Sequence, residues 1–206
     1  MILCDAYVVE DDAAVRASLT TLLSLRGGLE VRSFTDGAAF LAAADVLPDG
    51  VLLLDQHLPG IGGIELLDAL GERRARFPTI LLTGDGDLGL AIRAMEAGVR
   101  EFIEKPHDSR VLLQAVDEAC DDIHGDAGAA GRQAEIRARI ARLSLRERQV
   151  LRALARGQST RAIADELGIS PRACEADRAG AIEKLGARNL AQAVMIAHSA
   201  GLLAAD

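Results

Sequence analysis

Five polar residues of this chain stand directly after short apolar runs, and their types suit phosphoryl chemistry. Glu10 and Asp11 follow the first run, Asp55 ends the third, Thr83 the fourth, and Lys105 follows the fifth. If these runs share one sheet edge, three carboxylates crowd together and need a cation to neutralise them. Hard oxygen ligands suit Mg²⁺, which keeps some waters and commonly bridges to phosphate. A hydroxyl and an ammonium group add two partners for phosphoryl oxygens.

The pattern of strands and helices around these residues predicts that they meet at one edge of a sheet. The apolar runs are predicted strands, Ala6–Val9, Leu29–Val31, Val51–Leu54, Thr79–Leu82 and Glu101–Ile103. Helical apolar spacing marks residues 13–26, 37–44, 63–76 and 87–97, and a fifth helix is predicted at 109–122. Alternating strands and helices imply a five-stranded parallel α/β sheet with helices on both faces, a doubly wound, flavodoxin-like fold. Ligands bind such sheets at the carboxyl ends of the strands.

Composition divides the chain into two parts with opposite charge. Residues 1–122 carry 10 Lys+Arg against 22 Asp+Glu, a net of −12, whereas residues 123–206 carry 13 against 9, a net of +4. The three cysteines are widely spaced and odd in number, which predicts reduced thiols in a cytosolic protein rather than disulfides or a zinc site. No apolar run approaches a membrane span, so we expect a cytoplasmic protein without a membrane partner.

The second part is entirely helical in pattern. A Gly/Ala stretch at 124–131 predicts a linker. We place this linker at 123–142, expect it to be partly helical, and expect domains at 1–122 and 143–206 on either side of it. Ser144–Glu147 is a capping-box signature, Gly157 stops the helix that follows, and Ser159 or Thr160 starts the next. Ser170-Pro171 then begins a helix that runs to Leu185.

Four segments of residues 1–122 resemble the response-regulator receiver family, whose fold is CheY-like. They are Val8-Val-Glu-Asp-Asp12, Leu54-Asp-Gln-His-Leu-Pro-Gly60, Leu82-Thr-Gly84 and Phe102-Ile-Glu-Lys-Pro106. Each alone is a weak signal, but four in order at strand ends make a strong one. The resemblance implies a two-component regulator that is not an enzyme acting on other molecules.

The resemblance also implies a role for each position. Asp55 would accept the phosphoryl group from a sensor histidine kinase, and Lys105 would pair with that group. Mg²⁺ would be bound by Asp55, by Asp11 directly, by Glu10 through water, and by the main-chain carbonyl of His57. Thr83 would turn its hydroxyl towards the phosphate and Phe102 would move inward, remodelling the surface around residues 87–122 where the family usually dimerises.

Plainer interpretations exist for single residues of this group. Carboxylates after strands are often helix N-caps, and Asp12 is predicted to be one. Lys105 could be a solvated loop residue and Thr83-Gly84 an ordinary turn. The side chain of His57 is expected to face solvent, because only its carbonyl matches the family role.

Residues 143–201 resemble the LuxR-type helix-turn-helix of regulators of the NarL/FixJ class, and the layout is most similar to the FixJ branch. The matching text is Leu143-Ser-Leu-Arg-Glu-Arg-Gln-Val-Leu151, Gly157-Gln-Ser159, Ile163-Ala164, Leu167-Gly-Ile-Ser-Pro-Arg172, Glu175, Arg178 and Glu183-Lys-Leu-Gly186. The resemblance implies that Pro171–Leu185 enters the major groove of DNA. Phosphate contacts are predicted for Arg161, Arg172, Arg178 and Lys184, and base contacts for outward positions such as Glu175, Asp177, Arg178 and Ala181.

The sequence departs from that family at two places. Ala173-Cys174 replaces a usual Thr-Val pair, and Asp177 stands where an acidic residue is unusual. An unpaired acid facing phosphates costs affinity, although near bases it could accept from a cytosine amino group. Cys174 is predicted to be buried packing rather than a redox sensor.

We therefore expect a transcription regulator that dimerises on phosphorylation of Asp55 and binds a two-half-site operator. The dimer surface is predicted to include Leu88–Gly98 and the Glu101–Ile103 strand edge. A second hypothesis is a phosphorylation-switched adaptor whose C-terminal helices bind a protein, motivated by Asp177 and by the modest positive charge. A third is a phosphatase with an aspartyl nucleophile, but His57 stands where that class has a second acid.

Overall fold

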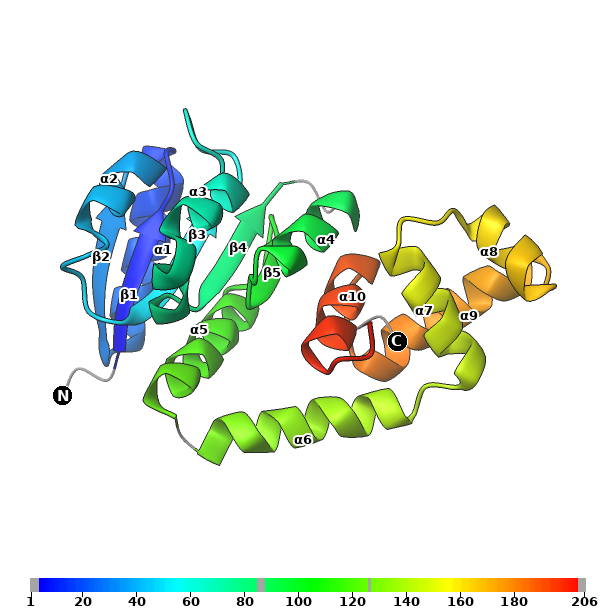
Figure 1. The fold of residues 1–206 in the computed structure, drawn as a ribbon. Coiled ribbons are helices and arrows are strands. Elements are labelled where there is room, and N and C mark those ends of the chain that lie inside the picture. The colour runs from blue at the N-terminus through cyan, green and yellow to red at the C-terminus, as the bar shows by residue number, and fades with distance from the viewer. Residues whose placement is uncertain (1–3, 85–87, 126, 204–206) are drawn as a thin grey trace. The chain divides into compact units, whose positions relative to one another are not determined.

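The computed structural model of the 206-residue chain describes residues 4–84, 88–125 and 127–203 (Figure 1). The chain divides into two compact units, Met1–Asp85 with Glu96–Ala129, and Gly86–Met95 with Ala130–Asp206. Residue 87, where the predicted fourth helix begins, lies outside the described residues, as do residues 1 and 206 at the outer ends of the two predicted domains.

The first unit contains a five-stranded parallel sheet, as predicted. Its strands are β1 (Cys4–Val9), β2 (Leu29–Phe34), β3 (Gly50–Asp55), β4 (Thr79–Thr83) and β5 (Glu101–Glu104). Their order is β2-β1-β3-β4-β5, and every pairing is parallel. Val9 pairs with Leu54, and Asp55 pairs with Leu82. This register brings the carboxyl ends of β1, β3 and β4 level with one another.

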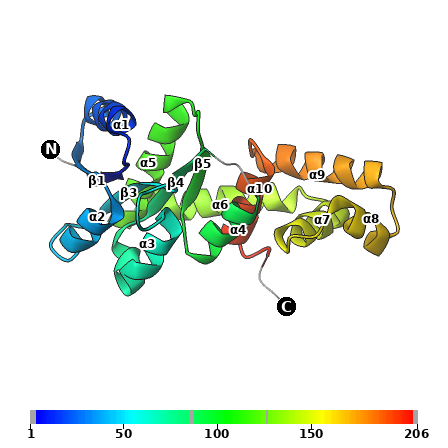
Figure 2. The same cartoon turned by 90° about the horizontal axis from the view of Figure 1, so that it is seen from above.

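Helices cover both faces of this sheet. Figure 2 shows α1 (Ala13–Arg26) and α5 (Ser109–His124) on one face, with α2 (Gly37–Ala43) and α3 (Gly63–Leu70) on the other. The predicted helix at 63–76 is two elements, because Gly71 has a φ of 56° and the chain continues as a 3₁₀ helix over Gly71–Arg76. Between β4 and β5 in the sequence, α4 spans Leu88–Glu96, and all of it except Glu96 belongs to the second unit.

Each face of the sheet has its own apolar core. Under α1 and α5 the core is aliphatic and includes Ala6, Val8, Leu19, Leu23, Val51, Leu53, Leu112 and Val116. The other face carries an aromatic cluster of Tyr7, Phe34, Phe40 and Phe77. The Tyr7 hydroxyl donates to the Pro48 carbonyl at 2.9 Å, and burial raises the pKa of Tyr7 to about 12.

A disulfide joins Cys4 at the start of β1 to Cys120 in α5. The prediction of reduced thiols is therefore wrong for these two residues in this structure. They are 116 positions apart in sequence, and the packing of α5 across the sheet brings their Cα atoms to 5.9 Å. Spacing along the chain could not reveal this contact, because it arises only from the tertiary fold.

The second unit contains the C-terminal helices, whose ends follow the predicted signals. They are α6 (Ala127–Ala141), α7 (Leu145–Ala155), α8 (Thr160–Leu167), α9 (Pro171–Leu185) and α10 (Leu190–Ser199). Ser144 forms the predicted capping box with Glu147, and the side chains of Ser159 and Ser170 cap α8 and α9. The linker expected at 123–142 is helical over most of its length, since α6 begins at Ala127 and ends at Ala141.

Two apolar clusters hold the C-terminal helices together. Leu151, Leu185 and Val194 belong to a cluster formed by α7, α9 and α10. Ile163 of α8 packs with Val150, Leu154 and Cys174 in the second cluster. Cys174 is 1% exposed and carries a free thiol, which confirms its prediction as buried packing. Among the described residues, no helix is both long enough and apolar enough to span a membrane.

Candidate functional site

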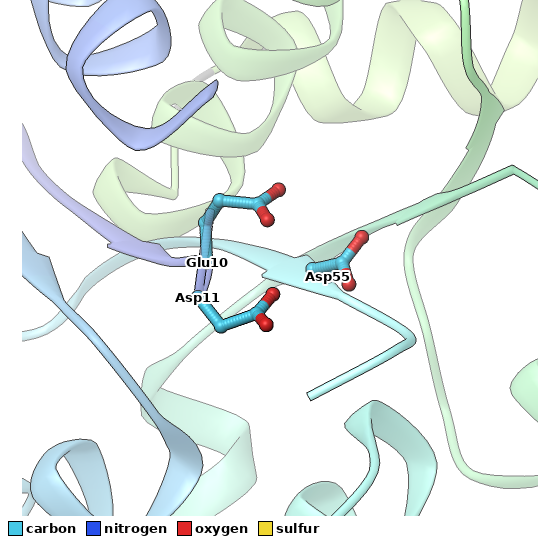
Figure 3. A group of neighbouring side chains, drawn as sticks. All are labelled: Glu10, Asp11 and Asp55. Carbon is cyan, nitrogen blue, oxygen red and sulfur yellow. The ribbon is translucent and has the colours of Figure 1, made fainter. Parts of the chain in front are cut away.

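The predicted acidic residues gather at the carboxyl edge of the sheet. Figure 3 shows Glu10 and Asp11 just after β1 and Asp55 at the end of β3. Carboxylate oxygens of the three residues lie within 4.8 Å of one another. Glu10 and Asp55 are buried, at 3% and 5% exposure, whereas Asp11 is exposed. Such a set of hard oxygen donors, partly open to solvent, fits a Mg²⁺ ion that keeps some of its waters.

Lys105 connects two of these carboxylates. Its Nζ atom lies 2.6 Å from Asp55 Oδ1 and 2.7 Å from Glu10 Oε2. Partial burial lowers the pKa of Lys105, but the hydrogen bonds and charges of Asp55 and Glu10 outweigh burial and raise it above its ordinary value. Lys105 is therefore a fixed cation at the mouth of the site, not a solvated loop residue.

The backbone after β3 orients the other oxygen of Asp55. The His57 main-chain N–H donates to Asp55 Oδ2 at 2.8 Å. The His57 side chain is exposed, as expected. Both Asp55 oxygens thus have a donor, which fixes the carboxylate at the end of its strand.

Thr83 and Phe102 are both buried on the neighbouring strands. Thr83, at the end of β4, is 0% exposed, and its carbonyl accepts from the Lys105 N–H at 2.7 Å. Phe102 in β5 is 2% exposed, so its side chain already lies inside the protein. Leu81 pairs with Phe102 and Thr83 with Glu104, which places the two predicted switch residues on adjacent strands.

Two contributors to this site were missed in the sequence. Arg16 donates from Nη1 to the main-chain oxygens of Glu10 at 2.7 Å and Asp11 at 2.9 Å, and so holds the β1–α1 turn. Gly63 allows α3 to start against β3, because a Cβ there would lie 2.8 Å from the Asp55 carbonyl oxygen. The Gly62-Gly63 pair so soon after Asp55 was an available signal of close backbone approach.

Asp12 has the plainer role predicted for it. Its side chain caps α1 by accepting from the N–H groups of Ala14 and Val15 at 2.8 and 2.9 Å. These two hydrogen bonds lower the pKa of the Asp12 carboxyl. Asp12 therefore caps a helix, and the acidic cluster consists of Glu10, Asp11 and Asp55.

The helix expected to read DNA presents a mixed surface. Arg172, in the first turn of α9, and Arg161 on α8 are exposed. Glu175 accepts from the Thr160 hydroxyl of α8 and pairs with Arg178, both at 2.8 Å. Glu175 therefore links α8 to α9 and also fixes one end of the Arg178 guanidinium.

Two predicted outward positions of α9 face inward instead. Ala181 is 0% and Asp177 is 9% exposed. Asp177 pairs with Arg146 of α7, whose Nε lies 2.6 Å from Asp177 Oδ2. The expectation of outward side chains was wrong for both residues, because the buried stripe of α9 runs through positions 174, 177, 181 and 185.

Lys184 is held within the domain. Its Nζ atom lies 2.8 Å from both carboxylate oxygens of Glu147, which is 6% exposed and also accepts from the Ser144 N–H. Burial raises the pKa of Glu147, but the bonds from Lys184 and Ser144 outweigh burial and lower it. The pair ties the end of α9 to the start of α7.

Comparison with family models gives two matches. Residues 6–117 match the response regulator receiver domain, and residues 141–197 match the bacterial regulatory proteins of the luxR family. The first match contains all the residues of the acidic site, and the second contains α7, α8 and α9.

Similar proteins align with nearly the whole length of this chain. The transcriptional regulatory protein FixJ of Azorhizobium caulinodans is 43% identical over 97% of this chain and 94% of its own length. FixJ of Rhizobium meliloti is 38% identical over 95% of each chain. The crystal structure of full-length FixJ from B. japonicum, 40% identical, matches with a TM-score of 0.57 over 97% of this chain and 98% of that one.

Proposed function

The chain belongs to the response regulators that join a receiver domain to a LuxR-family domain, and we infer from its acidic site that Asp55 is the residue phosphorylated. It is a transcription regulator that binds DNA through its C-terminal helix-turn-helix. The observation that carries the assignment of Asp55 is its contact with Lys105, at 2.6 Å, beside two further carboxylate residues.

The transfer itself follows from the charges at this edge. An Asp55 oxygen attacks the phosphorus of a phosphohistidine on the partner kinase, the P–N bond breaks, and the histidine leaves with the electron pair. Bound Mg²⁺, held by Asp55, Asp11, the His57 carbonyl and Glu10 through water, would neutralise the charge of the carboxylates and the phosphoryl oxygens. Lys105 would leave its contact with Asp55 Oδ1 and pair with a phosphoryl oxygen.

Phosphorylation would act on the buried pair Thr83 and Phe102. The new phosphoryl group brings about 1.5–2 negative charges and further acceptors. The Thr83 hydroxyl would turn towards it, and Phe102, which is already buried, would repack into the space behind Thr83. We propose that this remodels a surface formed by Leu88–Gly98 and the β5 edge, through which two copies pair.

Pairing would bring two DNA-binding modules onto one operator. Arg161, Arg172 and Arg178 would contact phosphates around a major groove that takes up α9. The net charge of this part is modest, so a single module should bind weakly. Two modules joined in a dimer gain affinity through their raised effective concentration, which favours an operator of two half-sites.

The adaptor hypothesis loses one of its two motivations. It rested on Asp177 and on the modest positive charge of this part, and Asp177 is buried and paired with Arg146 instead of facing a partner. The family match of residues 141–197 also favours DNA as the partner. We place the protein in the cytoplasm, where its kinase partner and DNA would both be accessible.

Labelling with acetyl phosphate and Mg²⁺ tests the phosphoacceptor. Intact mass should show one phosphoryl group on the wild type and on Asp68→Asn, a matched change of an exposed aspartate on α3. Asp55→Asn should remain unlabelled. Equal labelling of Asp55→Asn and wild type would overturn the assignment.

A further inference from the structure

We propose that Cys4 and Cys120 form a reversible thiol–disulfide pair that gives the receiver a second chemical input beside phosphorylation. Cys4 is the first residue of β1, and Cys120 lies in the last turns of α5. Their Cα separation of 5.9 Å is within the range that a disulfide spans without backbone movement. The pair lies at the amino end of β1, whereas Asp55 lies at the carboxyl end of β3.

The two sulfurs differ in access, which sets the order of the reaction. Cys4 is 6% exposed, while Cys120 is half-buried at the edge of the aliphatic core. A small disulfide can therefore reach Cys120 first. Cys174, in the second unit, is 1% exposed, and burial raises the pKa of its thiol, so it should react much more slowly.

The chemistry balances with a low-molecular-weight disulfide such as oxidised glutathione. The Cys120 thiolate attacks one glutathione sulfur, the glutathione S–S bond breaks, and one glutathione thiolate leaves. The Cys4 thiolate then attacks the Cys120 sulfur of the mixed disulfide and expels the second glutathione. Two protein thiols are oxidised, one glutathione disulfide is reduced, and the two released thiolates take up the two protons. Reduced glutathione reverses both steps.

The end of α5 is the element that this bond would control. Four acidic residues lie in its last two turns, Asp117, Glu118, Asp121 and Asp122. Negative charge there is unfavourable with the helix dipole, and acids four positions apart repel one another. Arg26 pairs with Asp117, and Arg100 pairs with Glu118 and Asp122, which offsets part of this cost.

Beyond Ala119, the apolar attachment of α5 to the sheet consists of two partly buried residues, Cys120 and Ile123. A covalent link to β1 therefore adds most stability to the end of α5, which has the fewest apolar contacts with the sheet. A disulfide in a cytoplasmic protein is usually transient, so this link should respond to the surrounding thiol–disulfide ratio and not be a permanent staple.

The test equilibrates the full-length protein with glutathione at increasing ratios of disulfide to thiol. Thiols are trapped with iodoacetamide under denaturing conditions and counted by intact mass. The wild type should pass from three alkylated cysteines to one, and the control Cys174→Ser from two to none. Cys4→Ser should instead gain a glutathione at Cys120. Peptide mapping of the wild type, which needs no variant, should recover Cys4 linked to Cys120.

The consequence is measured on the same samples. Oxidation should raise the Tm of the receiver by roughly 10 °C, because the link closes a long loop. Amide exchange at residues 117–124 should slow by roughly tenfold or more. The proposal is overturned if the wild type keeps three alkylatable cysteines at ratios where Cys4→Ser already carries glutathione. It is also overturned if oxidation leaves both Tm and exchange unchanged.

Discussion

Substituting Gly63 by alanine should destabilise the receiver, although the same change at neighbouring Gly62 should not. A Cβ at position 63 would lie 2.8 Å from the Asp55 carbonyl oxygen, 3.0 Å from Leu81 Cδ1 and 3.1 Å from Gln56 Cα. Ordinary contact begins near 3.4 Å, so the backbone must shift by roughly 0.6 Å. The Asp55 oxygen and the Gln56 Cα are backbone atoms, so they cannot move aside as the flexible end of a side chain could.

The magnitude comes from two opposing effects. Overpacking of this kind costs about 1–3 kcal/mol. Restricting the unfolded chain by replacing glycine with alanine returns about 0.4–1 kcal/mol. We therefore expect Gly63→Ala to lower the free energy of unfolding by about 1–2 kcal/mol. The shift would also move Asp55, and acetyl phosphate labelling should slow by roughly tenfold.

Gly62→Ala is the matched control. Gly62 has a φ of −69° and a ψ of 169°, which alanine adopts freely, and its Cβ would meet mainly the movable carboxylate of Glu65. Its stability should equal or slightly exceed that of the wild type. Tyr7 is the only tyrosine and tryptophan is absent, so tyrosine fluorescence in urea follows the receiver alone. If Gly63→Ala is as stable as Gly62→Ala, the conclusion that α3 starts in close contact with β3 at Gly63 is wrong.

Three further predictions concern the C-terminal domain. Glu147→Gln should lower the free energy of unfolding by about 1–2 kcal/mol at neutral pH, because it leaves Lys184 without its charged partner. The pKa of Glu147 is lower in the folded state than in the unfolded chain. The stability from this pair is therefore present above the unfolded pKa, near 4.3, and is lost as pH falls through the folded pKa. Unfolding in urea, followed by circular dichroism, should show the stabilities of variant and wild type converging in acid. Ser170→Ala should cost about 1 kcal/mol through loss of the α9 cap, and unchanged amide exchange in α9 would contradict this. Arg172→Ala should weaken binding to all DNA sequences alike and reduce the salt slope by about 0.9; a loss confined to one sequence would argue for a base contact.

The sheet and the acidic site could be predicted because their signals are local. Each strand contains a short, largely apolar segment, and each polar residue of the site stands at or just after the end of a strand. The parallel topology then brings Glu10, Asp55 and Lys105 to one edge whatever the details of packing. The missed contributors, Arg16 and Gly63, act through backbone atoms, which sequence patterns represent poorly.

The recognition helix was harder to orient. Its sequence is rich in alanine, so large apolar residues do not mark which face is buried. The family resemblance implies that Asp177 faces outward, whereas its ion pair with Arg146, 31 positions earlier, allows it to be buried. The contact between Cys4 and Cys120 has the same character, since it depends on how α5 lies on the sheet.

The central claim is that phosphorylation of Asp55 controls DNA binding through dimerisation. Sedimentation velocity of the full-length protein tests it, with beryllofluoride and Mg²⁺ as the phosphoryl mimic and with genomic DNA fragments present. The wild type and Asp68→Asn should shift from monomer to dimer, and DNA should sediment with the dimer. Asp55→Asn should remain monomeric and should sediment without DNA. Equal behaviour of Asp55→Asn and wild type, or DNA bound equally with and without the mimic, would contradict the account.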